Sequence, residues 1–303
     1  MQRQGPATVS AAVAVKMLRP RAARTAQSST RLQHEFQCAK KLSHPNILRV
    51  HDLQSDNGTS FMTMELGEGK LLSTLLLDHA NLREAVARKV LQGCADALTH
   101  AHSRGVVHGD FKPGNVFVTA NGSVKIFDFG AAARLPDAAQ DEAATRDPAR
   151  VAAATPAYAS PEVLEGQLPE RRDDVFSFAC VAYELLALQH PFEHGRSTQA
   201  RDVGWIPPRA WSLSAPQWQA LQSALSWQRE QRTAEVGTLL DALLAQPPEA
   251  VDPLPLADCE LRRAPGVKIA KKPLSDDFMR PDRGWWYFVI ALVVLILVVI
   301  AAR

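Results

Sequence analysis

The chain has 303 residues, of which 46% are hydrophobic and 22% are charged, and its formal net charge at pH 7 is +2. This length predicts one or two domains, and the hydrophobic content permits a sizeable core. The charges are nearly balanced and form no dense basic block, which argues against a nucleic-acid-binding protein. Cys38, Cys94, Cys180 and Cys259 lack the spacing of a metal site, which fits a reducing compartment.

The N-terminal part of the chain predicts a strand, a helix and a second strand. Residues 13–16 read Val-Ala-Val-Lys, and the alternation of a strand would place Lys16 on the face opposite the valines. Residues 32–42 repeat apolar side chains at helical spacing, and Glu35 lies within this predicted helix. Residues 61–65 then predict a short strand.

A hairpin is predicted in the middle of the chain. The apolar runs 116–118 and 124–127 are joined by Asn121-Gly122, a two-residue turn signal. The hairpin would bring Asn115, just before its first strand, close to Asp128, just after its second strand. Two oxygen-bearing side chains are therefore expected side by side at one end of the hairpin.

Four polar residues around this hairpin form a set suited to a nucleoside triphosphate and metal ions. Asp110 could accept a proton from an attacking hydroxyl group. Lys112 could neutralise charge on a phosphoryl group in transfer. Asn115 and Asp128 offer the hard oxygen ligands that Mg²⁺ prefers.

The same residues carry a resemblance to the protein kinase family, whose patterns are H-R-D-x-x-x-x-N and D-F-G. Lys112, two residues after Asp110, resembles the form found in serine/threonine kinases. The resemblance implies an α+β, two-lobed kinase fold, with a small β-rich N-lobe over residues 1–66 and a mainly helical C-lobe over residues 67–246. The matching positions are His108, Asp110, Asn115, Asp128, Phe129 and Gly130, of which His108 and Phe129 are implied to be structural.

The resemblance also implies how a nucleotide binds. Lys16 would hold the α- and β-phosphates of ATP and would be oriented by an ion pair with Glu35. Asn115 and Asp128 would bind Mg²⁺, with Mn²⁺ as an alternative. The adenine ring would be surrounded by a small residue, a gatekeeper methionine and two backbone groups of the hinge, at Ala14, Met64, Glu65 and Gly67.

Further matches are implied to be structural. Ser160-Pro-Glu162 stands where the family usually has A-P-E, and Thr155 aligns with the threonine that bonds the catalytic Asp and Lys. Glu162 would form a desolvated ion pair with Arg232. Asp174, at the start of a helix that is apolar nearly all round, would brace the backbone of the catalytic loop.

Two features depart from the family pattern. Only fifteen residues precede Lys16, and they cannot supply the glycine-rich loop and its two strands. Three explanations stay open: a true start upstream of Met1, a natural truncation with weak nucleotide binding, or a pseudokinase. Gly109 replaces the arginine that pairs with a phosphorylated activation segment, so we expect Asp110 to be competent without that phosphate.

The C-terminal part predicts a linker and a membrane anchor. Residues 247–284 contain several prolines and few bulky apolar side chains, which is typical of a linker. Residues 285–302 carry no charge, and a helix of that length spans about 27 Å. Several basic residues precede this segment and only Arg303 follows it, which predicts a cytoplasmic N-terminal side.

These observations predict a single-pass, membrane-anchored serine/threonine protein kinase with its kinase domain in the cytoplasm. Its partners would be ATP, proteins that offer Ser or Thr hydroxyls, and the membrane, with a homodimer as an open arrangement. Two alternatives remain: a membrane-anchored pseudokinase scaffold, and a small-molecule kinase of the same fold. Lys112, the 155–162 segment and Arg232 favour the protein kinases.

Overall fold

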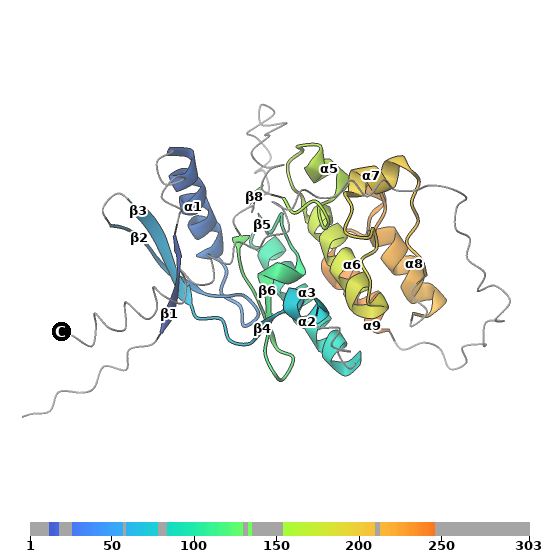
Figure 1. Ribbon diagram of the computed structural model, residues 1–303, viewed down its shortest axis with the longest axis horizontal. Coiled ribbons are helices and arrows are strands. Elements are labelled where there is room, and N and C mark those ends of the chain that lie inside the picture. The colour runs from blue at the N-terminus through green and yellow to red at the C-terminus, as the bar shows by residue number, and fades with distance from the viewer. Residues whose placement is uncertain are drawn as a thin grey trace, which may run out of the picture. The chain divides into compact units, whose positions relative to one another are not determined.

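The computed structural model describes most of the chain between residues 12 and 245 (Figure 1). Gly130, the predicted linker and the predicted membrane span at 285–302 lie outside the described residues. Within the part that is described, no helix is both long and apolar enough to cross a bilayer. The described ranges are 12–17, 26–56, 59–77, 84–129, 133–134, 154–209 and 213–245.

The N-terminal elements form a small sheet with one helix against it. The strands β1 (Val13–Met17), β2 (Val50–Asp56) and β3 (Thr59–Glu65) pair antiparallel in the order β1-β3-β2. Helix α1 (Ala26–Ala39) lies alongside them in Figure 1. Its side chain Leu32 packs with Met62 of β3 in a small apolar core. Both strands and the helix that the sequence predicted for this part are therefore present.

The hairpin predicted after position 115 is also present. Strands β6 (Val116–Val118) and β7 (Val124–Ile126) pair antiparallel, and β6 also pairs with β4 (Lys70–Leu71). Gly122 has a φ of 78°, a left-handed conformation that glycine adopts without strain. The short 3-10 helix η1 (Pro113–Asn115) leads into β6, and β5 (Val106–Val107) pairs with β8 (Ala133–Arg134).

The rest of the described chain is helical. Helix α6 (Arg171–Ala187) is buried from Asp173 to Leu185, because its side chains are apolar nearly all round. It packs against α3, α8 and α9. The helical elements are α2 (Leu72–Leu77), α3 (Glu84–Ser103), α5 (Pro161–Leu164), α6, α7 (Ser197–Asp202), α8 (Ala215–Ala224), the 3-10 helix η3 (Arg229–Gln231) and α9 (Val236–Leu244).

A buried ion network joins α5, α6 and η3. The guanidinium of Arg232 donates to Glu162 Oε2 at 2.5 Å and to Asp173 Oδ1 at 3.0 Å. Arg229 reaches the same acids, through its backbone N–H to Glu162 Oε1 (2.8 Å) and its Nη2 to Asp173 Oδ2 (2.7 Å). The Arg232 side chain is fully buried. Arg229 also pairs with Glu170 at 2.7 Å, so the predicted pair of Glu162 and Arg232 is part of a larger network with two cations and three anions.

We predict that Glu162→Gln lowers the free energy of unfolding by about 3–5 kcal/mol, because Arg232 then keeps its buried charge without its closest carboxylate. Urea unfolding with an unchanged m-value measures this loss. The control is Glu165→Gln, which removes a surface ion pair with Arg201 (2.8 Å) and should cost less than about 1 kcal/mol. Equal losses for both variants would contradict the prediction.

Candidate active site

Asp110 lies in a hydrogen-bond network with residues far from it in sequence. Lys112 Nζ donates to Asp110 Oδ2 at 2.5 Å and also donates to Thr155 Oγ1. The Thr155 backbone N–H donates to Asp110 Oδ1 at 2.8 Å, and Asn115 Nδ2 donates to the Asp110 carbonyl at 3.0 Å. Both carboxylate oxygens of Asp110 are therefore oriented by donors, which fixes the direction of the carboxylate group.

The backbone of this loop is held by one buried carboxylate. Asp174 Oδ2 accepts from the backbone N–H of His108 (2.8 Å), and Asp174 Oδ1 accepts from that of Gly109 (2.9 Å). His102 Nε2 donates to Asp174 Oδ2 at 2.7 Å. Burial opposes ionisation of Asp174, but the hydrogen bond and charge of His102, with the other donors, outweigh it and hold its pKa below the usual range. Gly109 has a φ of 76°, which favours glycine over the arginine usual in the family.

His108 connects the two halves of the catalytic motif. Its Nδ1 accepts from the backbone N–H of Asp110 (3.3 Å), which leaves the proton on Nε2 to donate to the Phe127 carbonyl (3.3 Å). Its ring packs against Phe129, with ring centroids 4.6 Å apart. His108 therefore ties the loop that carries Asp110 to the end of the hairpin that carries Asp128.

Lys16 is shared between two carboxylates. Its Nζ lies 2.6 Å from Glu35 Oε1 and 2.7 Å from Asp128 Oδ1. Burial opposes the charge on Lys16, but Asp128 and Glu35 outweigh it and raise the pKa of Lys16. Burial likewise opposes ionisation of Asp128, but Lys16 outweighs it and lowers the pKa of Asp128. The pairing with Glu35 was expected, whereas the direct contact with Asp128 was not.

Asn115 and Asp128 form a donor set that fits Mg²⁺. The Phe127 backbone N–H donates to the Asn115 carbonyl at 3.1 Å, so the two residues lie at the same end of the hairpin. One ionised carboxylate and one amide oxygen are hard ligands, and Mg²⁺ commonly completes its shell with water and phosphate oxygens. The described residues contain no cluster of three or more His, Cys, Asp or Glu side chains that could hold a metal alone. Such a two-ligand site would therefore depend on a bound nucleotide.

The residues expected around adenine lie on β1, β3 and the segment after them. Ala14 is the register partner of Met64 across β1 and β3. The Glu65 backbone N–H donates to the Arg49 carbonyl (2.8 Å), so this N–H is not available to a nucleotide. The Glu65 carboxylate pairs with Lys125 of β7 at 2.8 Å, which fixes the hinge to the hairpin.

Phe117 is a residue of this site that the sequence analysis missed. A Cβ added at Gly67 would lie 2.5 Å from the Phe117 ring, so only glycine fits there. The ring stacks on Phe127, with centroids 4.9 Å apart. Its neighbours Val116 and Val118 are buried in the core, and Phe117 points to the opposite face. That alternation was readable in the sequence, but the partner surface at Gly67 was not.

His102 is the second missed residue. It is buried on α3, where only its imidazole contact with Asp174 distinguishes it from a core residue. No spacing in the sequence links it to Asp174, which lies 72 positions later.

The comparison with known proteins agrees with this geometry. The chain matches the protein kinase domain model over residues 7–250. The chain belongs to the protein kinase family.

Named relatives of this chain occur in bacteria and plants. It is 33% identical to serine/threonine-protein kinase PknB of Mycolicibacterium smegmatis over 59% of this chain and 29% of that protein. It is 38% identical to CBL-interacting protein kinase 4 of Oryza sativa subsp. japonica over 60% of this chain and 40% of that protein. The chain thus spans well under half the length of these curated relatives.

A solved structure also resembles this chain. The crystal structure of the Mycobacterium tuberculosis PknI kinase domain superposes with a TM-score of 0.58 and 26% sequence identity, covering 76% of this chain and 84% of that chain. The two-lobed kinase fold expected from the motifs is therefore supported by the structure as well as by the family match.

We predict that His102→Leu lowers kcat about tenfold and changes the KM for ATP little, because it removes a donor that orients Asp174 and through it the catalytic loop. His102→Gln keeps an N–H donor and should restore most of kcat. Steady-state kinetics on folded protein measures both constants. A Leu variant with wild-type kcat would show that Asp174 needs only its two backbone donors.

Proposed function

We propose that this kinase transfers the γ-phosphoryl group of ATP to Ser or Thr hydroxyls of proteins. The observation that carries the proposal is the network of Asp110, Lys112 and Thr155, which lies beside the group formed by Lys16, Glu35 and Asp128. Relatives named as serine/threonine kinases support the choice of acceptor. The proposed substrates are proteins that offer Ser or Thr hydroxyls, as a class.

The proposed mechanism assigns each residue a step in an in-line transfer. Asp110 orients the acceptor hydroxyl and takes its proton as the new O–P bond forms and the bond between the γ-phosphorus and the bridging oxygen of the leaving ADP breaks. Lys112, held between Asp110 and Thr155, neutralises charge on the phosphoryl group. Lys16 is oriented by Glu35 to bind the α- and β-phosphates. Most of the rate enhancement would come from positioning and charge stabilisation.

Metal binding would fall to Asn115 and Asp128. A bound Mg²⁺, or Mn²⁺, supplies charge neutralisation on the phosphates. The lowered pKa of Asp128 keeps its carboxylate ionised and ready to bind a cation at neutral pH. Lys16 holds that carboxylate in place when no nucleotide is bound.

We also propose that the kinase does not require a phosphate on its activation segment. Asp110 already accepts from Thr155 and Lys112 in the unmodified chain, and Gly109 offers no side chain to pair with a phosphate. The ordering that a phosphate provides in other kinases would thus be present at the start.

Asp110→Asn should reduce phosphorylation of a generic protein substrate by at least about 100-fold while Mg-ATP binding remains, because the proton acceptor is lost and the phosphate contacts are kept. Radiolabel transfer and calorimetry measure the two quantities. Prior phosphatase treatment should leave the wild-type rate largely unchanged. Mg-ATP that fails to bind would favour the pseudokinase scaffold, and transfer to small molecules alone would favour the small-molecule kinase.

We further propose that residues 285–302 anchor the kinase in a membrane, with the catalytic domain on the cytoplasmic side. The support is the uncharged run of aromatic and aliphatic residues and the basic residues that precede it. One anchor per chain also leaves two copies free to meet in the membrane plane, which would allow a homodimer.

Val294→Lys should shift the full chain from the membrane fraction to the soluble fraction, because a lysine at the centre of a span costs about 2.5–3.5 kcal/mol. Val294→Leu is the matched control and should remain in membranes. Flotation after alkaline extraction, with a chain truncated after residue 284 as the soluble reference, measures the distribution. Wild-type protein that is extracted like the truncated chain would end the anchor proposal.

A further inference from the structure

Strand β1 leaves one edge of the N-terminal sheet open within the described part of the chain (Figure 1). The strand order is β1-β3-β2, so β1 pairs with β3 on one side only. The backbone N–H and C=O groups on the other side of an edge strand can pair with a further strand. Such an edge is a binding surface for an extended segment.

The hydrogen bonds of β3 show which of its backbone groups point to β1. The Glu65 N–H donates to the Arg49 carbonyl, next to β2. Backbone groups alternate between the two sides along a strand, so Met64 and Met62 point in the opposite direction. These two methionines therefore carry the bonds from β3 to β1.

The backbone groups of Val13, Val15 and Met17 face the open edge. The residues between them, Ala14 and Lys16, are the register partners of the two methionines and so take up the bonds to β3. The other three residues of β1 alternate with these two. Their N–H and C=O groups point away from β3 and have no partner among the residues that the structure describes.

The side chains of the same three residues form an apolar face on β1. Lys16 points toward α1, where it pairs with Glu35. Val13, Val15 and Met17 lie on the opposite face of the strand. Val13 is 41% exposed and Met17 is 45% exposed. Strand β1 thus combines unpaired backbone groups with exposed apolar side chains, and a pairing strand would remove both from water.

The opposite edge of the sheet is protected against pairing, whereas β1 is not. Strand β2 carries Asp52 and Asp56, and its register is irregular between Val50 and Asp52. Charged side chains and bulges are devices by which proteins prevent edge strands from pairing. The only charge on β1 is Lys16, and its ammonium is held in ion pairs with α1 and with the segment after β7. The sheet is therefore open to a partner at β1.

We propose that β1 pairs antiparallel with β1 of a second copy of this chain, with Val15 opposite Val15. A two-fold axis then relates the copies, which is the commonest symmetry of protein dimers. Val13 lies opposite Met17 of the other copy, so apolar side chains meet apolar side chains. Ala14 lies opposite Lys16, so the two lysines, whose like charges would repel, do not face each other. This self-complementarity is the reason to choose a second copy as the partner.

The interface includes the strand that carries Lys16, so the second copy lies beside the proposed phosphate-binding residue. It gives the proposed homodimer a defined contact and rests neither on the membrane anchor nor on catalysis. Stable interfaces usually involve about 20–30 residues from each partner, whereas β1 has five. We therefore expect a weak dimer in solution, which covalent trapping can detect because it retains each correctly aligned encounter.

Disulfide trapping on the full chain tests the register. The background is Cys259→Ala, because the three other cysteines are buried. Val15→Cys should form a disulfide-linked dimer under mild oxidation, since facing residues of a hydrogen-bonded antiparallel pair have Cα atoms about 5.5 Å apart, within disulfide range. Val13→Cys alone should not, because its two copies are offset along the strand by about 13 Å.

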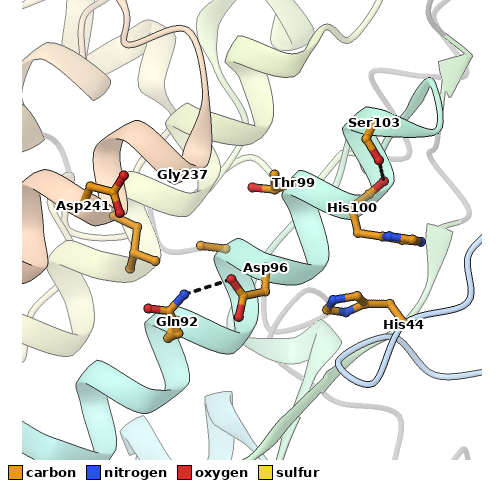
Figure 2. Close-up of a pocket in the computed structure, with 10 residues that line it drawn as sticks. His44, Gln92, Asp96, Thr99, His100, Ser103, Gly237 and Asp241 are labelled. Carbon is orange, nitrogen blue, oxygen red and sulfur yellow. Dashed lines mark hydrogen bonds between the residues drawn. The ribbon is translucent and has the colours of Figure 1, made fainter.

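A mixture of two single variants tests the direction of pairing. Val13→Cys and Met17→Cys, on chains with tags of different size, should form a disulfide between unlike chains. Asp241→Cys is the control for random collisions, because Asp241 is exposed on α9 at the hollow shown in Figure 2, away from β1. It should yield at least about tenfold less dimer than Val15→Cys, since no pairing raises its effective concentration.

The proposal fails if Val15→Cys forms no more dimer than Asp241→Cys, which would mean that another segment or solvent covers the β1 edge. It also fails if Val13→Cys alone dimerises as readily as Val15→Cys, because pairing would then be parallel or nonspecific. The mixed pair at the two exposed positions decides the matter even if Val15→Cys does not fold. The measurements on Asp110→Asn and Val294→Lys stand in either case, so the kinase activity and the anchor are tested separately.

Discussion

The buried carboxylate of Asp174 is the interaction on which the candidate active site depends. It is fully buried at the start of α6 and accepts donors from α3 and from two successive backbone N–H groups of the catalytic loop. A buried charge with such donors is costly to displace, because its alternatives in the core offer no compensation. The loop therefore takes its shape from the helical core, and Asp110 inherits its position from that shape.

A second electrostatic link joins the small sheet to the catalytic loop. Lys16 on β1 contacts Glu35 on α1 and Asp128 after β7, so one ammonium group connects three segments. Asp128 and Glu35 raise the pKa of Lys16, and Lys16 lowers the pKa of Asp128, which keeps Lys16 and Asp128 ionised at neutral pH. The ion pairs among these residues maintain an arrangement that phosphates and a metal could enter.

The amino-acid sequence by itself determined the elements and the chemistry-bearing residues that are close together along the chain. The turn at Asn121-Gly122 and the alternation around it predicted the hairpin, and the run of α6 that is apolar nearly all round predicted a buried helix. Both signals are local, since they arise from the geometry of a few consecutive residues. The family resemblance then extended this local reading to the pairs of Lys16 with Glu35 and of Glu162 with Arg232.

Only the tertiary structure decided the contacts that no local period or family motif announces. Lys16 meets Asp128 across 112 positions, His102 meets Asp174 across 72, and Phe117 limits position 67 to glycine. The partners in each case are brought together by packing of the hydrophobic core, and the sequence near either residue carries no trace of the other.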